Sequence, residues 1–137
     1  MTDTAFPLQE AAFAAIAGDP TVQSLLGNPV RFYDVAPESP TFPFAVFGDW
    51  KTSAYAGLPG AFEHDIRIRI FSRYGGRKET RQIMSALHDV LHDAPLSPPG
   101  HRLVSMRFVF SDVFLRADRG SWDGIMRFRA VDEVLAE

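Results

Sequence analysis

The sequence of 137 residues contains no cysteine. This absence excludes a disulfide framework and any metal site built on thiolates, and it fits a reducing compartment without requiring one. No apolar run approaches the roughly 18 residues that a membrane-spanning helix needs. The first ten residues lack a basic region followed by an apolar stretch, so we expect no signal peptide. The net charge of -3 disfavours a domain whose surface coats nucleic acid.

Several signatures of enzymes are also missing. No serine lies in a nucleophile elbow of the form G-x-S-x-G, which disfavours a serine hydrolase. The glycine pairs at 57–60 and 75–76 are typical of turns, because neither precedes the G-K-[ST] of a phosphate loop. His64 and Asp65 are adjacent in a predicted strand, so their side chains point to opposite faces and cannot form a catalytic pair. We therefore expect a protein that is not an enzyme.

One pattern leaves a metal-dependent alternative open. His88 and His92 are four residues apart in a predicted helix and share one face, so they could bind zinc as in H-E-x-x-H. However, the general-base position is occupied by the shorter Asp89, and no third ligand is evident. Histidines in the last turn of a helix also interact favourably with the helix dipole. A metal-dependent hydrolase using His88 and His92 is thus the weaker alternative, and we expect no cofactor.

What the chain does contain is enough apolar material for a core. Hydrophobic residues make up 46% of the sequence and aromatic residues 12%, which excludes global disorder and predicts one domain over residues 1–137. Turn signals and periodicity predict helices at 6–17, 20–26 and 77–92, and strands at 30–35, 42–50, 62–74, 102–110 and 124–131. This order predicts an α+β fold, with an antiparallel or mixed sheet and helices packed on one face.

Two segments of the chain are harder to place. Residues 52–60 are small and polar apart from one tyrosine and one leucine, and they are expected to form a flexible hairpin arm. The acidic tail from residue 131 onward is expected to form a short helix or to fray. The remaining segments contain no repeat and no low-complexity tract.

The strand at 62–74 alternates strictly between apolar and polar residues. Ile66, Ile68 and Ile70 take one face with Phe62 and His64, which predicts that this face lies in the core. Two later strands repeat the arrangement, with Val104, Met106, Phe108 and Phe110 in one and Met126, Phe128 and Ala130 in the other predicted to face inward. The opposite face of the sheet then carries five arginines, namely Arg67, Arg69, Arg107, Arg127 and Arg129.

The arginine face has three interpretations. It could be solvated, as single strand arginines usually are, or it could contact nucleic acid phosphates. Few aromatic residues interleave with the arginines, which weakens the second interpretation. We favour a subunit or partner interface, since arginine is enriched at interfaces. Acidic residues of a neighbouring copy would complement it, the candidates being Asp112, Asp118, Asp123, Asp132, Glu133 and Glu137. Trp50, Tyr55 and Trp122, expected to be exposed in or beside loops, are predicted interface anchors.

Six segments, taken in order, resemble the tail terminator (tail completion) proteins of long-tailed phages, a family also found in gene transfer agents. Each segment alone is a strand or a turn of low specificity, but the ordered set spans nearly the whole chain. The segments are VRFYD (30–34), FPFAVFG (42–48), HDI leading to FSR (64–73), LHDAPL (91–96), GHRLV (100–104) and GIMRFRA (124–130).

The resemblance implies a small α+β subunit of a ring, with six copies the expected number, at the head-proximal end of a tail tube. Such a ring stops tube growth and offers a docking surface to the head completion proteins, while DNA passes through it without sequence reading. The resemblance implies no catalytic residue and no cofactor. Its expected location is the neck of a phage-like particle, with assembly in the bacterial cytoplasm. A neighbouring head–tail connector that contacts the portal is the alternative.

Overall fold

The computed structural model of the chain describes residues 3–135. Its helices are α1 (Ala5–Ala17), α2 (Pro20–Leu26) and α3 (Lys78–Leu91). Its strands are β1 (Phe32–Tyr33), β2 (Phe44–Ala54), β3 (Ala61–Ser72), β4 (His101–Leu115) and β5 (Trp122–Val134).

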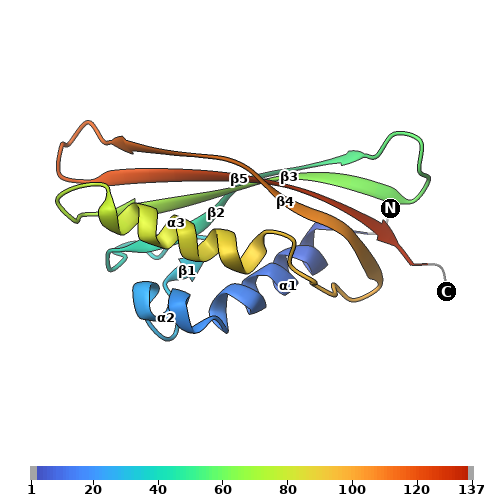
Figure 1. Cartoon of the computed structure of the whole chain (residues 1–137), viewed down its shortest axis with the longest axis horizontal. Helices are drawn as coiled ribbons and strands as arrows, with labels where there is room; N and C mark the ends of the chain where they lie inside the picture. The colour runs from blue at the N-terminus through green and yellow to red at the C-terminus, as the bar shows by residue number, and fades with distance from the viewer. Residues whose placement is uncertain (1–2, 136–137) are drawn as a thin grey trace.

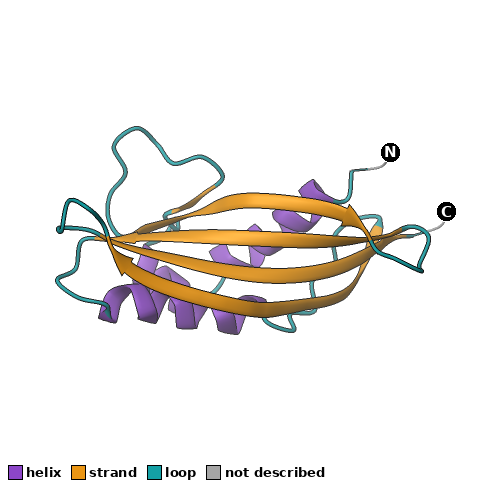
Figure 2. Cartoon of the chain, turned by 90° about the horizontal axis from the view of Figure 1, so that it is seen from above, coloured by secondary structure: helices purple, strands orange, loops and turns teal. Residues whose placement is uncertain are grey.

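These strands form one mixed sheet in the order β1-β2-β3-β5-β4. β1 runs parallel to β2, and the other pairs are antiparallel. The three helices lie together on one face of this sheet (Figure 1). Seen from above, the opposite face of the sheet is uncovered (Figure 2). The structure confirms the predicted α+β architecture. No helix within residues 3–135 is long and apolar enough to cross a membrane.

Side-chain oxygens cap the starts of α1 and α2. The Asp19 carboxylate accepts a hydrogen bond of 3.0 Å from the backbone N–H of Val22, and Pro20 occupies the first turn of α2, where its missing N–H costs nothing. At α1, the Asp3 carboxylate accepts from the backbone N–H of Ala5 at 2.9 Å. Side-chain oxygens thus satisfy donors that helix starts leave free.

The core lies between the sheet and the helices. β3 contributes the buried side chains of Ile66, Ile68 and Ile70 to this core, as their alternation predicts. The helices contribute their apolar stripes, with Leu8, Ala12 and Ile16 from α1, Val22 and Leu26 from α2, and Ile83, Leu87 and Leu91 from α3. α3 packs closely against the sheet at Gly124 of β5, where a Cβ atom would lie 2.7 Å from Cγ2 of Thr80. The absence of a side chain there lets the helix settle onto the strand.

β4 departs from the predicted alternation. Its 15 residues pair with the 13 residues of β5, because register shifts at Leu103/Ser105 and Phe108/Phe110 each insert one extra residue. Such bulges turn the following side chains to the other face. Val104 is the extra residue of the first bulge and is 48% exposed, and the second bulge turns Phe110 to the other face, where it is 41% exposed. The prediction that these two residues face the core is wrong, whereas Met106 is buried and Phe108 half-buried beside it.

Three predicted boundaries also change. The strand expected at 30–35 is only the two residues of β1. β2 extends to Ala54, so the expected arm is reduced to the tip at 55–60 of the β2–β3 hairpin. The tail neither forms a helix nor frays up to Val134, because β5 continues there and pairs with the starts of β3 and β4. The β2–β3 tip and the β4–β5 tip lie at opposite ends of the sheet (Figure 1).

Candidate functional site

The face of the sheet that carries no helix holds the five predicted arginines. Arg67 of β3 lies directly opposite Arg127 of β5, and Arg107 of β4 lies opposite Arg129 of β5. Two like charges at such positions repel each other unless acidic residues intervene. The prediction that these side chains share one face is confirmed, and we call this surface the outer face.

Acidic residues beside the arginines, three on the outer face and one in the loop after α3, neutralise most of this charge. Arg127 donates two hydrogen bonds to the two carboxylate oxygens of Asp65, at 2.7 and 2.8 Å. This bidentate contact is the strongest geometry available to the pair. The other ion pairs are Arg129 with Glu63 at 3.1 Å, Arg69 with Asp123 at 3.1 Å and Arg107 with Asp93 at 3.9 Å. The outer face is thus a lattice of alternating charges rather than a bare basic stripe.

Arg67 is the exception among the five. It is exposed, and no carboxylate of residues 3–135 lies within ion-pair distance of it. Its cross-strand neighbour is Arg127, and the nearby carboxylate of Asp65 is already engaged by that residue. Among the predicted interface arginines, Arg67 therefore has the charge that is most available for an ion pair with another protein.

The acidic residues expected to serve a neighbouring copy are mostly occupied within the chain. Asp132 is buried beside His64, and Asp123 is buried beside Arg69 and Arg116. Asp118 accepts hydrogen bonds from the backbone of Gly120 and Ser121 in the β4–β5 turn, and these bonds lower its pKa. Glu133 pairs with Arg102 at 2.6 Å. Only Asp112 remains exposed without such a contact among the described residues, and Glu137 lies outside them.

The Asp65–Arg127 pair gives the outer face a pH-dependent contribution to stability. The hydrogen bond from Arg127 is the main cause of the lowered pKa of Asp65, and the same contact raises the pKa of Arg127. Because the folded-state pKa lies below the unfolded-state value, this contribution is complete above about pH 4 and is lost as the pH falls further.

Asp65→Asn should therefore lower the free energy of unfolding by about 1 kcal/mol near neutral pH, the size expected of a partly exposed but bidentate pair. The difference from the parent chain should shrink as the pH falls below about 4. Urea denaturation at several pH values measures both effects. Asp112→Asn, at an exposed position of the same face, is the control and should change nothing. A difference for Asp65→Asn that persists undiminished in acid would contradict this account.

A cluster of aromatic residues lies at the β1 side of the outer face. The rings of Phe44 and Phe71 stack with centroids 4.8 Å apart, and Phe42 meets Phe44 edge-on at 5.0 Å. The guanidinium of Arg73 lies 4.0 Å above the ring of Phe42, and that of Arg69 lies 5.1 Å from the ring of Phe71. The cluster was not predicted from the sequence, although the apolar residues on both faces of β2 were a signal for it.

The three predicted anchors lie in different surroundings. Trp50 is half-buried in β2, and its indole N–H donates to Nδ1 of His64 at 3.0 Å. Trp122 is half-buried at the start of β5, beneath the guanidinium of Arg77 at 4.6 Å. The expectation that both tryptophans are exposed is wrong, because Trp50 packs beside buried His64 and the guanidinium of Arg77 covers the ring of Trp122. Tyr55 is exposed at the β2–β3 tip, as expected.

His88 of α3 and His92, the residue that follows the helix, both contact Phe108 of β4. Their rings stack with centroids 4.9 Å apart, and Nδ1 of His92 accepts a hydrogen bond of 3.1 Å from the backbone N–H of Phe108. Nε2 of His92 lies 3.3 Å from Asp93, and Nδ1 of His88 lies 3.2 Å from Asp89. Residues 3–135 contain no group of three or more histidine and acidic side chains that could hold a metal ion.

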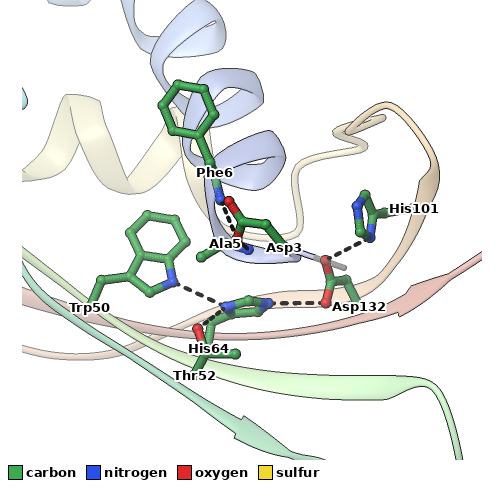
Figure 3. A network of polar contacts seen from close by, with 8 residues as sticks. All are labelled: Asp3, Ala5, Phe6, Trp50, Thr52, His64, His101 and Asp132. Atoms are coloured by element: carbon green, nitrogen blue, oxygen red, sulfur yellow. Dashed lines mark hydrogen bonds and ion pairs between the residues drawn. The ribbon is translucent and has the colours of Figure 1, made fainter. Parts of the chain in front are cut away.

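A buried polar network crosses four strands on the helix side of the sheet (Figure 3). Nδ1 of His64 receives the indole N–H of Trp50, and Oγ1 of Thr52 lies 3.1 Å from the same nitrogen. Since indole only donates, Nδ1 is the acceptor, and Nε2 carries the proton that is donated to Asp132 at 3.0 Å. His101 lies 3.8 Å from the other oxygen of Asp132. His64 and Asp132 are fully buried, so the network stabilises the sheet and contacts no ligand from solvent.

Comparison with known proteins identifies two likenesses. The family model described as Tail completion protein gp17 matches residues 10–133. The fold is similar to that of a chain in the virion of a native gene transfer agent (GTA) particle, with a TM-score of 0.87 and 22% identity. That match covers 97% of this chain and 99% of the virion chain, and at this identity it shows a shared fold. No curated protein matches the sequence.

Proposed function

Because the chain belongs to the tail completion protein gp17 family, we propose that it is a structural component of the tail of a phage-like particle. The observation that carries this proposal is the family match over residues 10–133, to which the shared fold with a virion chain adds support. The role needs no catalysis. Within the particle, we place the protein at the neck after assembly in the bacterial cytoplasm.

The finer proposal is a ring of about six copies that caps the head-proximal end of the tail tube, as the resemblance of the six sequence segments implies. The ring ends the growth of the tube and joins it to the head completion or connector protein. DNA passes through the ring, and no base is read. The uncovered outer face supports an assembly role, because a sheet with helices on one side only leaves the other side free for partners.

Within this assembly, we propose that the outer face contacts the tail tube protein or the head completion protein. Arg67 is the leading contact, since its charge is not paired within the described chain, whereas Arg69, Arg107, Arg127 and Arg129 each have an acidic partner. Tyr55 is the exposed aromatic candidate, and the half-buried Trp50 and Trp122 contribute only their accessible edges.

Electron microscopy of particles made without this gene tests the function. Filled heads that are not joined to tails, beside tails of irregular or excessive length, are the expected result. Tails of normal length that fail to attach would instead indicate a connector that contacts the portal. Normal particles, active in infection or gene transfer, would overturn the proposal altogether.

Complementation of a strain that lacks this gene tests whether the outer face makes the proposed contact. A copy carrying Arg67→Glu should fold normally but yield at least about tenfold fewer joined particles, since a like-charge contact in an interface costs several kcal/mol. Lys78→Glu makes the same charge change on the helix side, at an exposed position of α3, and should complement fully. Equal complementation by the two variants would remove Arg67 from the proposed contact.

A further inference from the structure

The edge of the sheet that β4 forms is open over part of its length. We propose that the second half of β4, from Val109 to Leu115, binds an extended segment of a different protein of the particle, which adds to the sheet as a strand and points acidic side chains toward α3. This inference rests on the proposed role in particle assembly and adds a binding site to it. The contact proposed for Arg67 is a separate one.

The first half of the β4 edge is closed within the chain. β4 is the last strand of the sheet, so one side of its backbone faces away from β5. On this side, the N–H of Phe108 donates to Nδ1 of His92 at 3.1 Å, and the carbonyl of Met106 accepts from the N–H of Asp93 at 2.8 Å. The segment that follows α3 therefore occupies the edge as far as Phe108, and a covered edge does not pair with another strand.

Beyond Phe108, the edge presents unpaired backbone groups. In an antiparallel ladder, residues whose N–H and C=O point toward the neighbouring strand alternate with residues whose groups point away. Phe108 points away from β5, and the extra residue of the second bulge reverses the alternation. At the far end, Arg116 points toward β5, because its N–H donates to the carbonyl of Ser121 at 2.9 Å. Counting from either end, the groups that face away are those of Ser111, Val113 and Leu115, and no hydrogen bond within residues 3–135 engages them there.

On the helix side of this edge, a hollow lies between β4 and α3, and α3 projects beyond β4 in the view from above (Figure 2). Arg81, Ser85 and His88 line the hollow from α3. Arg81 is exposed, and no carboxylate of the described residues lies within ion-pair distance of it. A carboxylate on an added strand would supply the hydrogen-bond acceptor that this guanidinium lacks.

On the outer face, exposed Asp112 stands between exposed Phe110 and Phe114. Asp112 also borders the hollow, but it lies opposite Ile125, on the outer face of β5. Successive side chains of a strand alternate between the two faces, so a segment that points a carboxylate toward α3 presents its next residue to Asp112. A lysine or arginine fits there, because its charge meets the carboxylate while its apolar stem packs on the two phenylalanines.

The chemistry of the edge favours a partner other than a second copy. The other free edge of the sheet is β1, which has only two residues. The chain that continues from β1 contains Pro37, Pro40 and Pro43, which have no N–H to donate to a ladder. A segment that alternates acidic with basic residues matches both the unpaired backbone and the two charged side chains, as in strand addition to an exposed sheet edge.

Peptide binding to the purified chain tests this site. The probe is a short synthetic peptide in which glutamate and lysine alternate, with both ends blocked. At about ten times its dissociation constant, it should slow amide hydrogen exchange at Ser111, Val113 and Leu115 roughly tenfold, because each N–H is accessible only in the unbound fraction. N-methylation of one alternate set of peptide residues should abolish binding, and methylation of the other set should not. Absence of slowed exchange, or binding that survives both methylations, would overturn the added strand.

Variants of the chain separate backbone pairing from charge. Ser111→Pro removes an N–H that points away from β5, so it spares the ladder with β5 and should weaken peptide binding at least about fivefold. Ser111→Ala keeps this N–H and should bind as the parent chain does. Arg81→Glu should weaken binding by a similar factor, and adding Asp112→Lys should restore it, because the same peptide then binds shifted by one residue. Failure of this restoration would contradict the charge arrangement.

The alternative occupant has its own signature. A dimer of the purified chain that Ser111→Pro dissociates, measured by sedimentation, would assign this edge to a second copy and overturn the proposal. The proposed function and the added strand also fail differently. Normal particles without the gene refute the function and leave peptide binding unaffected, whereas unchanged exchange at the three amides refutes the added strand alone.

Discussion

Replacement of His64 by leucine should lower the free energy of unfolding by about 3 to 5 kcal/mol, which is the cost of breaking a buried pair from one side. The variant removes the N–H that reaches Asp132 and the nitrogen that accepts from Trp50. The Asp132 carboxylate would keep only His101, at 3.8 Å, in a site with no solvent access. Denaturant unfolding followed by circular dichroism measures the loss.

The double variant His64→Leu, Asp132→Leu separates this effect from a simple packing defect. Because it removes both partners, it leaves no buried carboxylate without a donor, and it should be more stable than the two single changes would predict if they added. Asp132→Asn keeps an oxygen that can accept from His64 and should be the mildest change. A His64→Leu chain within about 1 kcal/mol of the parent would show that the network contributes little.

Gly124→Ala should destabilise the chain by about 1 to 3 kcal/mol, the usual cost of overpacking a core. The new methyl group would lie 2.6 Å from Cε of Met84 and 2.7 Å from Cγ2 of Thr80. The end of the methionine can move aside, but Thr80 is fully buried and β-branched, so its side chain has few alternatives. α3 would have to shift away from β5. Thermal or urea unfolding detects the change.

The matched control is Gly120→Ala in the β4–β5 turn, where the nearest atom to a new Cβ is a backbone oxygen at 4.0 Å. It should remain within about 0.5 kcal/mol of the parent. Adding Thr80→Ser to Gly124→Ala removes Cγ2, the less movable of the two obstructing atoms, and should recover part of the lost stability. If Gly124→Ala alone has no effect, α3 and β5 are less closely packed than the structure shows.

The parts of the fold that depend on local pattern could be predicted from the sequence. The strict alternation around Ile66, Ile68 and Ile70 identified β3 and its buried face, and Asp19 with Pro20 fixed the start of α2. β4 could not be predicted in the same way, because a bulge is decided by pairing with β5 and leaves no mark in the order of apolar residues. Val104 and Phe110 were misplaced for this reason.

The same distinction between local pattern and strand pairing applies to the candidate site. That Arg67 and Arg127 share a face follows from side-chain alternation and could be predicted. Which acidic residues neutralise the arginines depends on strand register, which brings Asp65 from β3 beside Arg127 of β5, 62 positions later. The buried pairing of His64 with Asp132 was missed because Asp132 lies in a segment expected to be a tail. The register in which distant strands pair cannot be predicted from one sequence.

The uncovered outer face has a thermodynamic consequence. Contacts made there, or at the sheet edges, form with the folded chain and not with the unfolded one, so by mass action they add to its stability. A partner present at a hundred times its dissociation constant contributes about 2.7 kcal/mol. In the proposed ring, a chain weakened in isolation would be supported by its neighbours. Variants that unfold readily when purified could then still yield intact particles, because the assembly itself keeps them folded.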